Sequence, residues 1–326
     1  MAIKVGFVGT GGIANTHLDT LSKKENVTIT ALCDVVLERA QEKADKYGGK
    51  AYADFRAMLD TEGLDALFIC TPPMAHGEIE MAAVERRLPM FIEKPIARDL
   101  TMAAPILLAI AAADLITVVA YKYRWDAHVE RARQMLAGKT HGLVSGWFWT
   151  GMPGVPWWRV QAQSGGQMVE QTTHIVDMAR FLCGEITHVA AFEAHQVMRR
   201  LHRDATAADA ATASLRFASG AVGTITNTYM LGAGGGGSGL DVIAHNFRLQ
   251  VAGAKLQWWG PEESGELENE SNGYVREVEA FLKAVETGDQ SEIYSDYADA
   301  YRTLAVTEAV HTSAQQGGRV VEVAAG

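Results

Sequence analysis

Residues 3–17 read IKVGFVGTGGIANTH, an apolar run followed at once by a glycine-rich turn. The turn fits the pattern G-x-G-x-x-A at Gly9, Gly11 and Ala14. In a strand–turn–helix unit, the first glycine permits the tight turn and the second lets the backbone approach a pyrophosphate. A small third residue keeps the helix close to the sheet, and the helix N-terminus faces the phosphates. The pattern alone fits a dinucleotide cradle and a plain strand–helix turn equally well.

The first 120 residues alternate between short apolar runs and helix-length segments. Apolar runs without polar alternation are typical of strands in a parallel sheet that is covered on both faces. The rhythm therefore predicts an α/β Rossmann domain, a doubly wound parallel sheet with right-handed crossovers. The predicted strands are Ile3–Val8, Val27–Leu32, Ala66–Cys70, Met90–Ile92 and Ile116–Ala120. The predicted helices are Ile13–Lys24, Val36–Tyr47, His76–Arg87 and Met102–Ala113.

The character of the sequence changes after about residue 122, where strand-like runs begin to dominate. We predict an α+β domain with an open-faced, predominantly antiparallel sheet. The domains are 1–122 and 123–326, and the last helix is expected to pack back on the first domain. The predicted strands are Thr212–Phe217, Val222–Met230, Asp241–Val251, Lys255–Trp259 and Arg319–Val323, with ASGA at 218–221 as a hairpin turn. The predicted helices are Asp126–Ala137, Tyr274–Glu286 and Tyr297–Gln316.

Composition excludes several classes of function. The net charge of −10 argues against nucleic acid and against a basic membrane-binding face. Met102–Ala120 is long enough to suggest a membrane span, but Pro105 and Asp114 interrupt it, so we expect a buried helix followed by a buried strand. The start of the chain does not have the pattern of a secretion signal. Cys33, Cys70 and Cys183 fit neither a disulfide framework nor a zinc spacing, which favours a reducing cytoplasm.

Asp34 ends the second predicted strand, 20 residues after Ala14. In a Rossmann unit, an acid at this distance holds the adenosine ribose hydroxyls and repels a 2′-phosphate. The position favours NAD over NADP, although a loop residue or a helix cap would also account for it. The cofactor-binding candidates around the turn are Gly9, Gly11, Gly12, Ile13 and Asp34.

Two further segments follow predicted strands, at the rim where a doubly wound sheet binds its ligand. TPPMAH places Thr71, Pro72 and His76 near the nicotinamide half of a cofactor, or else forms a proline-stiffened turn. EKP places Glu93 and Lys94 at the same rim. Positive charge and desolvation there would lower the pKa of a lysine and let it handle the proton of a substrate hydroxyl. Without that context, Lys94 would be an ordinary surface lysine.

The segment SGGQMVEQTTHIVDMARFLCGE, residues 164–185, is the richest in chemistry of the second domain. Glu170, His174 and Asp177 are spaced i, i+4 and i+7, so they share a face if the segment is one helix. Histidine has a suitable pKa to accept an alcohol proton near neutrality, and Glu170 would orient it or touch the substrate. A core histidine, a solvated helix face and a metal site are the alternatives, and no further His or Cys has a suggestive metal-ligand spacing.

Other residues are candidates for substrate contact. Trp157 and Trp158 would stack on a sugar ring, and Arg159 would bind hydroxyls or a carboxylate, unless the three anchor a core or an interface. Trp258 and Trp259 fit structural packing or a subunit contact better. The glycine-rich segment Gly232–Gly239 reads as a mobile hairpin loop or as a substrate lid.

Taken together, the GxGxxA turn, the TPPMAH segment, the EKP segment and the GG…E…H..D block resemble the Gfo/Idh/MocA oxidoreductases over residues 3 to about 185. The resemblance implies an NAD(P)-bound Rossmann domain and an open-faced sheet domain that carries the substrate and often mediates oligomerisation. It implies Lys94 and His174 as the proton-handling pair, residue 170 in the substrate site, and often a cis bond before Pro95. Two departures are Glu170, where the family more often has Asp, and Lys122, where many members have Asn or Gln.

These observations predict an enzyme that transfers a hydride between NAD and a secondary alcohol of a sugar or cyclitol. The substrate-binding candidates are Glu170, Lys122, Arg124, Trp157, Trp158 and Arg159. The expected assembly is a homo-oligomer, a dimer or tetramer formed through the sheet of the second domain. An NAD-retaining glycoside-cleaving enzyme and a nucleotide-sensing binding protein, both known uses of this architecture, are the alternatives.

Overall fold

The computed structural model describes residues 2–232 and 234–324, and the chain divides into two compact units. The first unit comprises residues 1–97, 101–122 and 272–300. The second comprises residues 98–100, 123–271 and 301–326. One break between the units falls after Lys122, and residues 272–300, which lie within the range 123–326 of the predicted second domain, also belong to the first unit. That segment carries helix α11, whereas the last helix, α12, contributes only its first turn to this unit.

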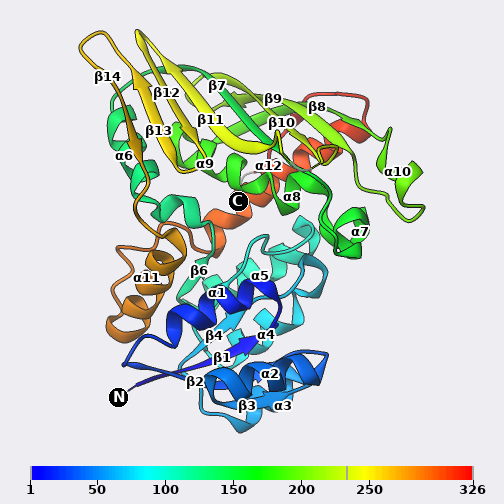
Figure 1. The fold of residues 1–326 in the computed structure, drawn as a ribbon, viewed down its shortest axis with the longest axis vertical. Coiled ribbons are helices and arrows are strands. Elements are labelled where there is room, and N and C mark those ends of the chain that lie inside the picture. Colours follow the sequence, from blue (N-terminus) through cyan, green and yellow to red (C-terminus); the bar gives the residue numbers. More distant parts are fainter. Residues whose placement is uncertain (1, 233, 325–326) are drawn as a thin grey trace. The chain divides into compact units, whose positions relative to one another are not determined.

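The first unit is built on a six-stranded sheet in the order β3-β2-β1-β4-β5-β6, with every neighbouring pair parallel (Figure 1). Its strands are β1 (Ile3–Val8), β2 (Val27–Cys33), β3 (Lys50–Tyr52), β4 (Ala66–Ile69), β5 (Met90–Ile92) and β6 (Thr117–Val119). Its helices are α1 (Gly12–Leu21), α2 (Leu37–Tyr47), α3 (Phe55–Thr61), α4 (Glu78–Glu85), α5 (Leu100–Ala113) and α11 (Gly273–Thr287), with the 3₁₀ turn η1 (Pro73–Ala75). This strand order confirms the doubly wound Rossmann fold.

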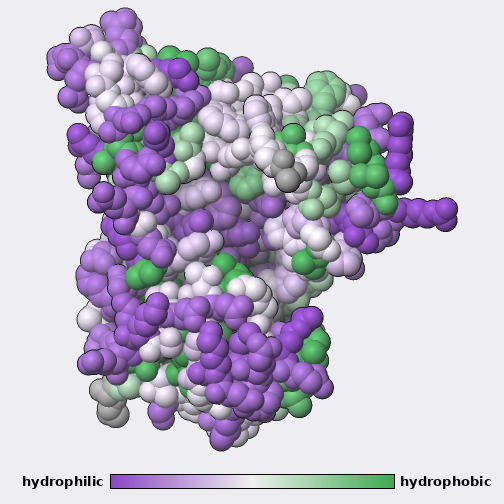
Figure 2. Space-filling view, in the orientation of Figure 1, coloured by the Kyte–Doolittle hydropathy of each residue, from purple (hydrophilic) through white to green (hydrophobic). Residues whose placement is uncertain are grey.

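The apolar runs form strands because helices cover both faces of this sheet. Every residue of β4, β5 and β6 is buried. Phe68 of β4 stacks between Phe7 and Phe91, with ring centroids 4.8 Å away on each side. Phe281 of α11 meets the ring of Phe68 edge-on at 5.6 Å. The outward surface of α2, by contrast, is strongly hydrophilic (Figure 2).

The second unit is built on a nine-stranded sheet in the order β14-β13-β12-β11-β7-β10-β9-β8-β15. All neighbouring strands are antiparallel except β7 and β10, which are parallel. The strands are β7 (His141–Trp149), β8 (Ile186–Ala194), β9 (Ala210–Phe217), β10 (Val222–Thr228), β11 (Gly237–Ala244), β12 (Phe247–Ala252), β13 (Lys255–Trp259), β14 (Ser264–Glu268) and β15 (Val321–Glu322). The predominantly antiparallel sheet of the α+β prediction is confirmed.

Helices cover only one face of the second sheet (Figure 1). The helices of this unit are α6 (Ala127–Leu136), α7 (Gln161–Ser164), α8 (Gln167–Glu170), α9 (Thr173–Cys183), α10 (Met198–Leu201) and α12 (Tyr297–Gln315), with the 3₁₀ turns η2 (Lys122–Trp125) and η3 (Pro156–Arg159). Apolar residues of α6, α9 and α12 form one buried core with the inward side chains of the strands. Strand β9 shows the expected alternation, with every second residue buried.

Two predictions about the elements were wrong, and several elements were missed. The segment Asp241–Val251 is not one strand, because Asn246 takes a positive φ of 53° and turns the chain between β11 and β12. Gly232–Gly239 is not a loop throughout, because Gly237–Gly239 belong to β11. One residue of this segment, Ala233, lies outside the described residues. The elements β3, α3, β7, α7, β8, α10 and β14 were not anticipated from the sequence.

The stretch Met102–Ala120 contains a helix and a strand, as α5 and β6. The strand is buried as expected, but the prediction of a buried helix was wrong, because α5 buries only Ala103, Ile106 and Ile110. Among residues 2–232 and 234–324, no helix has the length and apolar character needed to cross a membrane. All three cysteines are free and buried. Burial raises the pKa of the Cys33 and Cys183 thiols to about 12, so both remain protonated and behave as small apolar side chains, as expected.

Candidate active site

The glycine turn between β1 and α1 is open toward a ligand. Gly9 has a φ of +87°, and a Cβ there would lie 2.4 Å from the carbonyl oxygen of Cys70, so only glycine fits. A Cβ on Gly11 or Gly12 would meet nothing within 4 Å. Free space therefore lies beside the first amides of α1, where a helix N-terminus attracts phosphate. The turn fits the pyrophosphate of a dinucleotide.

Asp34 holds this turn in place from the end of β2. Its carboxylate accepts hydrogen bonds from the Thr10 amide (3.0 Å) and hydroxyl (3.1 Å). It also accepts one from the amide of Val36 at 2.9 Å, just before α2. The buried carboxylate thus ties the glycine turn to the neighbouring strand, and Oδ1, which accepts only one of the three hydrogen bonds, retains a lone pair for a further donor.

The TPPMAH segment leaves hydrogen-bonding capacity unused at the end of β4. The hydroxyl of Thr71 and Nε2 of His76 are buried and have no partner among the described residues. The other ring nitrogen of His76 is hydrogen bonded to Glu80 in α4. Buried polar atoms are nearly always satisfied in folded proteins, so two orphans at one strand end point to a missing ligand.

The EKP segment directly follows β5, and both carboxylate oxygens of its glutamate form hydrogen bonds within the protein. Glu93 is hydrogen bonded to Nε2 of His17 at 2.8 Å, and both side chains are buried. The second oxygen of Glu93 accepts from the amide of Lys94 at 3.2 Å. The peptide bond between Lys94 and Pro95 is cis, as the resemblance implied. Glu93 therefore anchors the backbone that carries Lys94.

These segments meet at one edge of the first sheet. Gly9, Asp34, Thr71 and Glu93 follow β1, β2, β4 and β5, and those strands are consecutive neighbours in the order β2-β1-β4-β5. The order reverses direction between β1 and β4, where doubly wound sheets bind their ligands. Lys122, further along the same unit, places its ammonium 4.2 Å from the centre of the Tyr274 ring in α11.

In the second unit, Glu170, His174 and Asp177 do not lie on one continuous helix, so the condition for a face shared by all three is not met. Glu170 ends the short helix α8, and α9 begins at Thr173. The break between α8 and α9 is stabilised by a residue of another element. The side-chain amide of Asn227 in β10 donates a hydrogen bond of 2.9 Å to the buried hydroxyl of Thr172. Only His174 and Asp177 share one helix.

Arg124 and Asp177 form a buried bidentate ion pair. The guanidinium donates to the two carboxylate oxygens at 2.8 and 2.6 Å. The hydroxyl of Thr303 in α12 also donates to Asp177, at 2.9 Å. The pair joins η2, α9 and α12, so the structure gives Arg124 a partner inside the protein. We therefore interpret Arg124 as a residue that supports the site.

The aromatic segment that precedes residues 164–185 forms a compact group. Trp157 and Trp158 of η3 stack with ring centroids 5.0 Å apart and an interplanar angle of 26°. Arg159 donates through Nε and Nη2 to the two oxygens of Asp204, each at 2.9 Å. Neither tryptophan is fully buried, so a stacking surface remains. The guanidinium fork is already occupied by Asp204.

Several residues around these groups were not anticipated from the sequence. His17 is the last residue of the opening stretch, residues 3–17. Its partner Glu93 lies 76 positions further along the chain, so the local sequence does not reveal the pairing. Tyr123 lies against the ring of His174, with centroids 5.1 Å apart. Among the described residues, no group of three or more His, Cys, Asp or Glu side chains is arranged to hold a metal ion.

The fold and these groups define a dinucleotide-dependent oxidoreductase with a second, C-terminal domain. Residues 3–121 match the model of the oxidoreductase family with an NAD-binding Rossmann fold, and residues 129–256 match the GFO/IDH/MocA C-terminal domain. The chain belongs to the Gfo/Idh/MocA oxidoreductase family, and its first unit is an NAD-binding domain.

Curated relatives share about a quarter of their residues with this chain. Myo-inositol 2-dehydrogenase of Thermotoga maritima is 25% identical, covering 88% of this chain and 89% of its own. Levoglucosan dehydrogenase of Pseudarthrobacter phenanthrenivorans is 26% identical, covering 85% of each chain. D-xylose 1-dehydrogenase (NADP(+)) 2 of Haloferax volcanii is 24% identical over 97% of this chain and 98% of its own.

Among solved structures, the complex of levoglucosan dehydrogenase with NADH and levoglucosan superposes with a TM-score of 0.87. The match covers 99% of this chain and 100% of that chain, at 20% identity. GenD2 from gentamicin A biosynthesis, in complex with NAD, has a TM-score of 0.85 at 21% identity and covers 99% and 97%. At this identity the likeness establishes the common two-domain fold.

Proposed function

We propose that the protein is an NAD-dependent dehydrogenase that acts on a secondary alcohol of a sugar or cyclitol. The observation that carries the proposal is the shared edge of the first sheet. An open glycine turn, two unsatisfied polar atoms and the Lys94 segment all follow neighbouring strands there. The names of the inositol, xylose and levoglucosan dehydrogenase relatives support the substrate class.

The residues of the chain divide the work. Bound NAD supplies the hydride chemistry. Gly9, Gly11, Gly12 and Ile13 form the turn that binds the pyrophosphate, while Asp34 binds the adenosine ribose and disfavours NADP. Thr71, Pro72, His76 and Glu93 line or support the nicotinamide half. Lys94 and His174 handle the proton of the substrate hydroxyl, and His174 acts as the base.

The substrate is bound by groups of several kinds. Glu170 and Lys122 supply an anion and a cation for hydroxyls or a carboxylate. Trp157 and Trp158 offer a stacked aromatic surface to the apolar face of a sugar ring. Arg159 contributes the donors that Asp204 leaves over.

A panel of sugars, cyclitols and sugar acids tests this function, each assayed with NAD and with NADP by the absorbance of the reduced cofactor. Lys94→Ala and His174→Ala are expected to lower turnover by roughly 10²- to 10⁴-fold, while calorimetry still detects NAD binding to His174→Ala. A protein that binds no dinucleotide would refute the proposal. Tight NAD binding without turnover on any polyol would favour a nucleotide sensor instead.

A second candidate is an NAD-retaining glycoside-cleaving enzyme, which oxidises a sugar transiently, eliminates the aglycone and returns the hydride. The paired tryptophans favour it, because a stacking surface of two rings suits a substrate with more than one sugar. Release of aglycone from a glycoside without net NADH would support this candidate. Steady accumulation of NADH from free sugars would count against it.

We also propose that the protein is a cytoplasmic homo-oligomer, a dimer or tetramer, that assembles through the uncovered face of the second sheet. Leu143 of β7, Val222 of β10 and Ile243 of β11 are neighbours in register and project to that face. They are 43%, 51% and 41% exposed. The surface over β7, β9 and β10 is pale to green in Figure 2, which marks it as weakly hydrophobic. Such a face suits a second copy of the chain.

A further inference from the structure

Tyr123 lies directly against the imidazole of His174. It belongs to η2, and the two ring centroids are 5.1 Å apart with an interplanar angle of 51°. His174 is partly exposed, as a base that meets a substrate must be. Contact with a neighbouring ring restricts rotation of the imidazole about its side-chain bonds.

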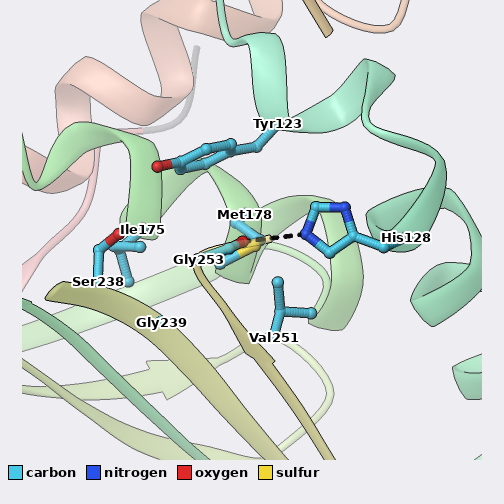
Figure 3. A pocket seen from close by; sticks show the side chains of 8 residues that line it. All are labelled: Tyr123, His128, Ile175, Met178, Ser238, Gly239, Val251 and Gly253. Atoms are coloured by element: carbon cyan, nitrogen blue, oxygen red, sulfur yellow. Dashed lines mark hydrogen bonds between the residues drawn. The ribbon is translucent and has the colours of Figure 1, made fainter. Parts of the chain in front are cut away.

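The environment of Tyr123 leaves its ring little room to move. A cavity of only about 10 Å³ lies beside it, enough for a single water molecule and far too small for a sugar. Figure 3 shows Tyr123 on one side of this cavity, opposite Val251. The rest of the lining comes from His128, Ile175, Met178, Ser238, Gly239 and Gly253. The ring is therefore confined between His174 and closely packed apolar side chains.

The hydroxyl end of Tyr123 is also constrained. It interacts by hydrogen bonding with the side chain of Ser238, near the start of β11. Burial raises the pKa of the Tyr123 phenol, so the group stays protonated at neutral pH. Ser238 thus adds a polar contact to the apolar packing around the ring.

A second histidine beside the cavity, His128, has different contacts. His128 is buried, and its Nε2 is hydrogen bonded to the carbonyl oxygen of Gly253 at 3.2 Å (Figure 3). Burial lowers the pKa of His128, which keeps its ring neutral. His128 is held by a hydrogen bond to the backbone, whereas His174 has a ring contact with Tyr123.

We propose that Tyr123 is a positioning residue that holds the imidazole of His174 in the orientation needed for proton transfer. The inference rests on the role proposed for His174. A general base acts only within hydrogen-bond reach of its proton, and a small misplacement of a catalytic group lowers turnover steeply. The ring of Tyr123 supplies the orientation, and Ser238 fixes the ring.

The test is steady-state kinetics on the best polyol from the panel. Tyr123→Leu removes the ring and is expected to lower kcat by roughly 30-fold, with KM changed less than about twofold. Tyr123→Phe keeps the aromatic ring and loses only the hydroxyl, so its kcat is expected to stay within about threefold of the wild-type value. Ser238→Ala is expected to match Tyr123→Phe, and the double variant to lose no more than either single one.

Val251→Ala is the matched control, because it enlarges the same cavity from the opposite side without touching His174. It is expected to lower the melting temperature but to leave kcat unchanged. Equal loss of kcat in Val251→Ala and Tyr123→Leu would overturn the inference, as would an effect of Tyr123→Leu confined to KM.

A measurement without turnover separates this inference from the proposed function. In ¹⁵N-histidine NMR of the ligand-free protein, the His174 ring, assigned with His174→Gln, is expected to give narrow signals. Those signals should broaden or average in Tyr123→Leu and remain narrow in Val251→Ala. Unchanged signals in Tyr123→Leu would contradict the positioning role, even in a protein that oxidises no polyol.

Discussion

The two sheets of this protein are buried in different ways. The parallel sheet of the first unit has helices on both faces, and β4, β5 and β6 are buried throughout. The nine-stranded sheet of the second unit has helices on one face only, and large apolar side chains such as Leu143 and Phe192 remain exposed on its strands. A sheet covered twice needs no partner, whereas a sheet covered once leaves an apolar face for one.

The same contrast extends to the candidate site. In the first unit, the site groups follow the ends of adjacent strands, so the backbone places them. In the second unit, buried polar contacts between distant segments place them, above all the pair of Arg124 and Asp177. The two units therefore respond to different kinds of substitution, as the following predictions state.

The largest effect is expected from the sheet that is covered twice. Phe68→Ala removes a fully buried ring that stacks on two others and should lower the free energy of unfolding by about 3–5 kcal/mol. Phe192→Ala, on a side chain 62% exposed in the second sheet, should change it by less than about 1 kcal/mol. Urea unfolding of both variants measures the difference. Similar losses would mean that the two sheets are not buried differently.

The next effect concerns two bidentate Arg–Asp pairs of the second unit. Asp177→Asn leaves the buried Arg124 uncompensated and should cost about 3 kcal/mol of stability. Asp204→Asn breaks the exposed pair with Arg159 and should leave stability nearly unchanged. Thermal and urea unfolding distinguish the two cases. An Asp204→Asn variant as unstable as Asp177→Asn would show that burial does not decide the strength of these pairs.

The uncovered face gives a third prediction. Leu143→Asp places a charge among the apolar residues of that face and should weaken self-association on the order of 100-fold. Leu108→Asp, at a side chain 71% exposed on α5, is the control and should leave association unchanged. Sedimentation equilibrium measures both. A Leu143→Asp variant that assembles like the wild type would exclude this face as the interface.

The smallest effect is a dependence of stability on pH. Glu193 of β8 is hydrogen bonded to Nδ1 of His311 in α12, at 3.0 Å, and raises its pKa. The stabilisation is full below the unfolded-state pKa of about 6.5. It disappears as the pH rises through the higher folded-state pKa. Wild type should exceed His311→Gln in stability by less than about 1 kcal/mol at about pH 6. The gap should close by about pH 8.5, and a constant gap would assign the contact to packing.

Much of the first unit could be predicted from the sequence. The runs Ile3–Val8 and Met90–Ile92 are strands with the predicted bounds. A short uninterrupted apolar run between helix-length segments is typical of a strand buried on both faces. The glycine turn, Asp34 and the EKP segment follow from the same logic, since strand ends fix where their side chains lie. The short strand β3 and helix α3 lack that contrast and were missed.

The second unit was less predictable for physical reasons. The break between α8 and α9 depends on Asn227, a residue of another element whose contact leaves no local trace in the sequence around Thr172. The turn at Asn246 has a local signal, because asparagine tolerates a positive φ, but it lies within an apolar run that resembles one strand. The partner of Arg124 lies 53 positions away, so no spacing rule could identify it.

The return of α11 to the first unit has a consequence for how the chain is made. All six strands of the parallel sheet have been synthesised once the chain reaches Val119, but Phe281, which packs on Phe68 and Phe91, follows only after β14. Until then, part of the aromatic core of the nascent domain stays uncovered and available to chaperones. For the same reason, a fragment ending at Lys122 lacks a layer of its own core. An independent nucleotide-binding module would need residues 272–300 attached.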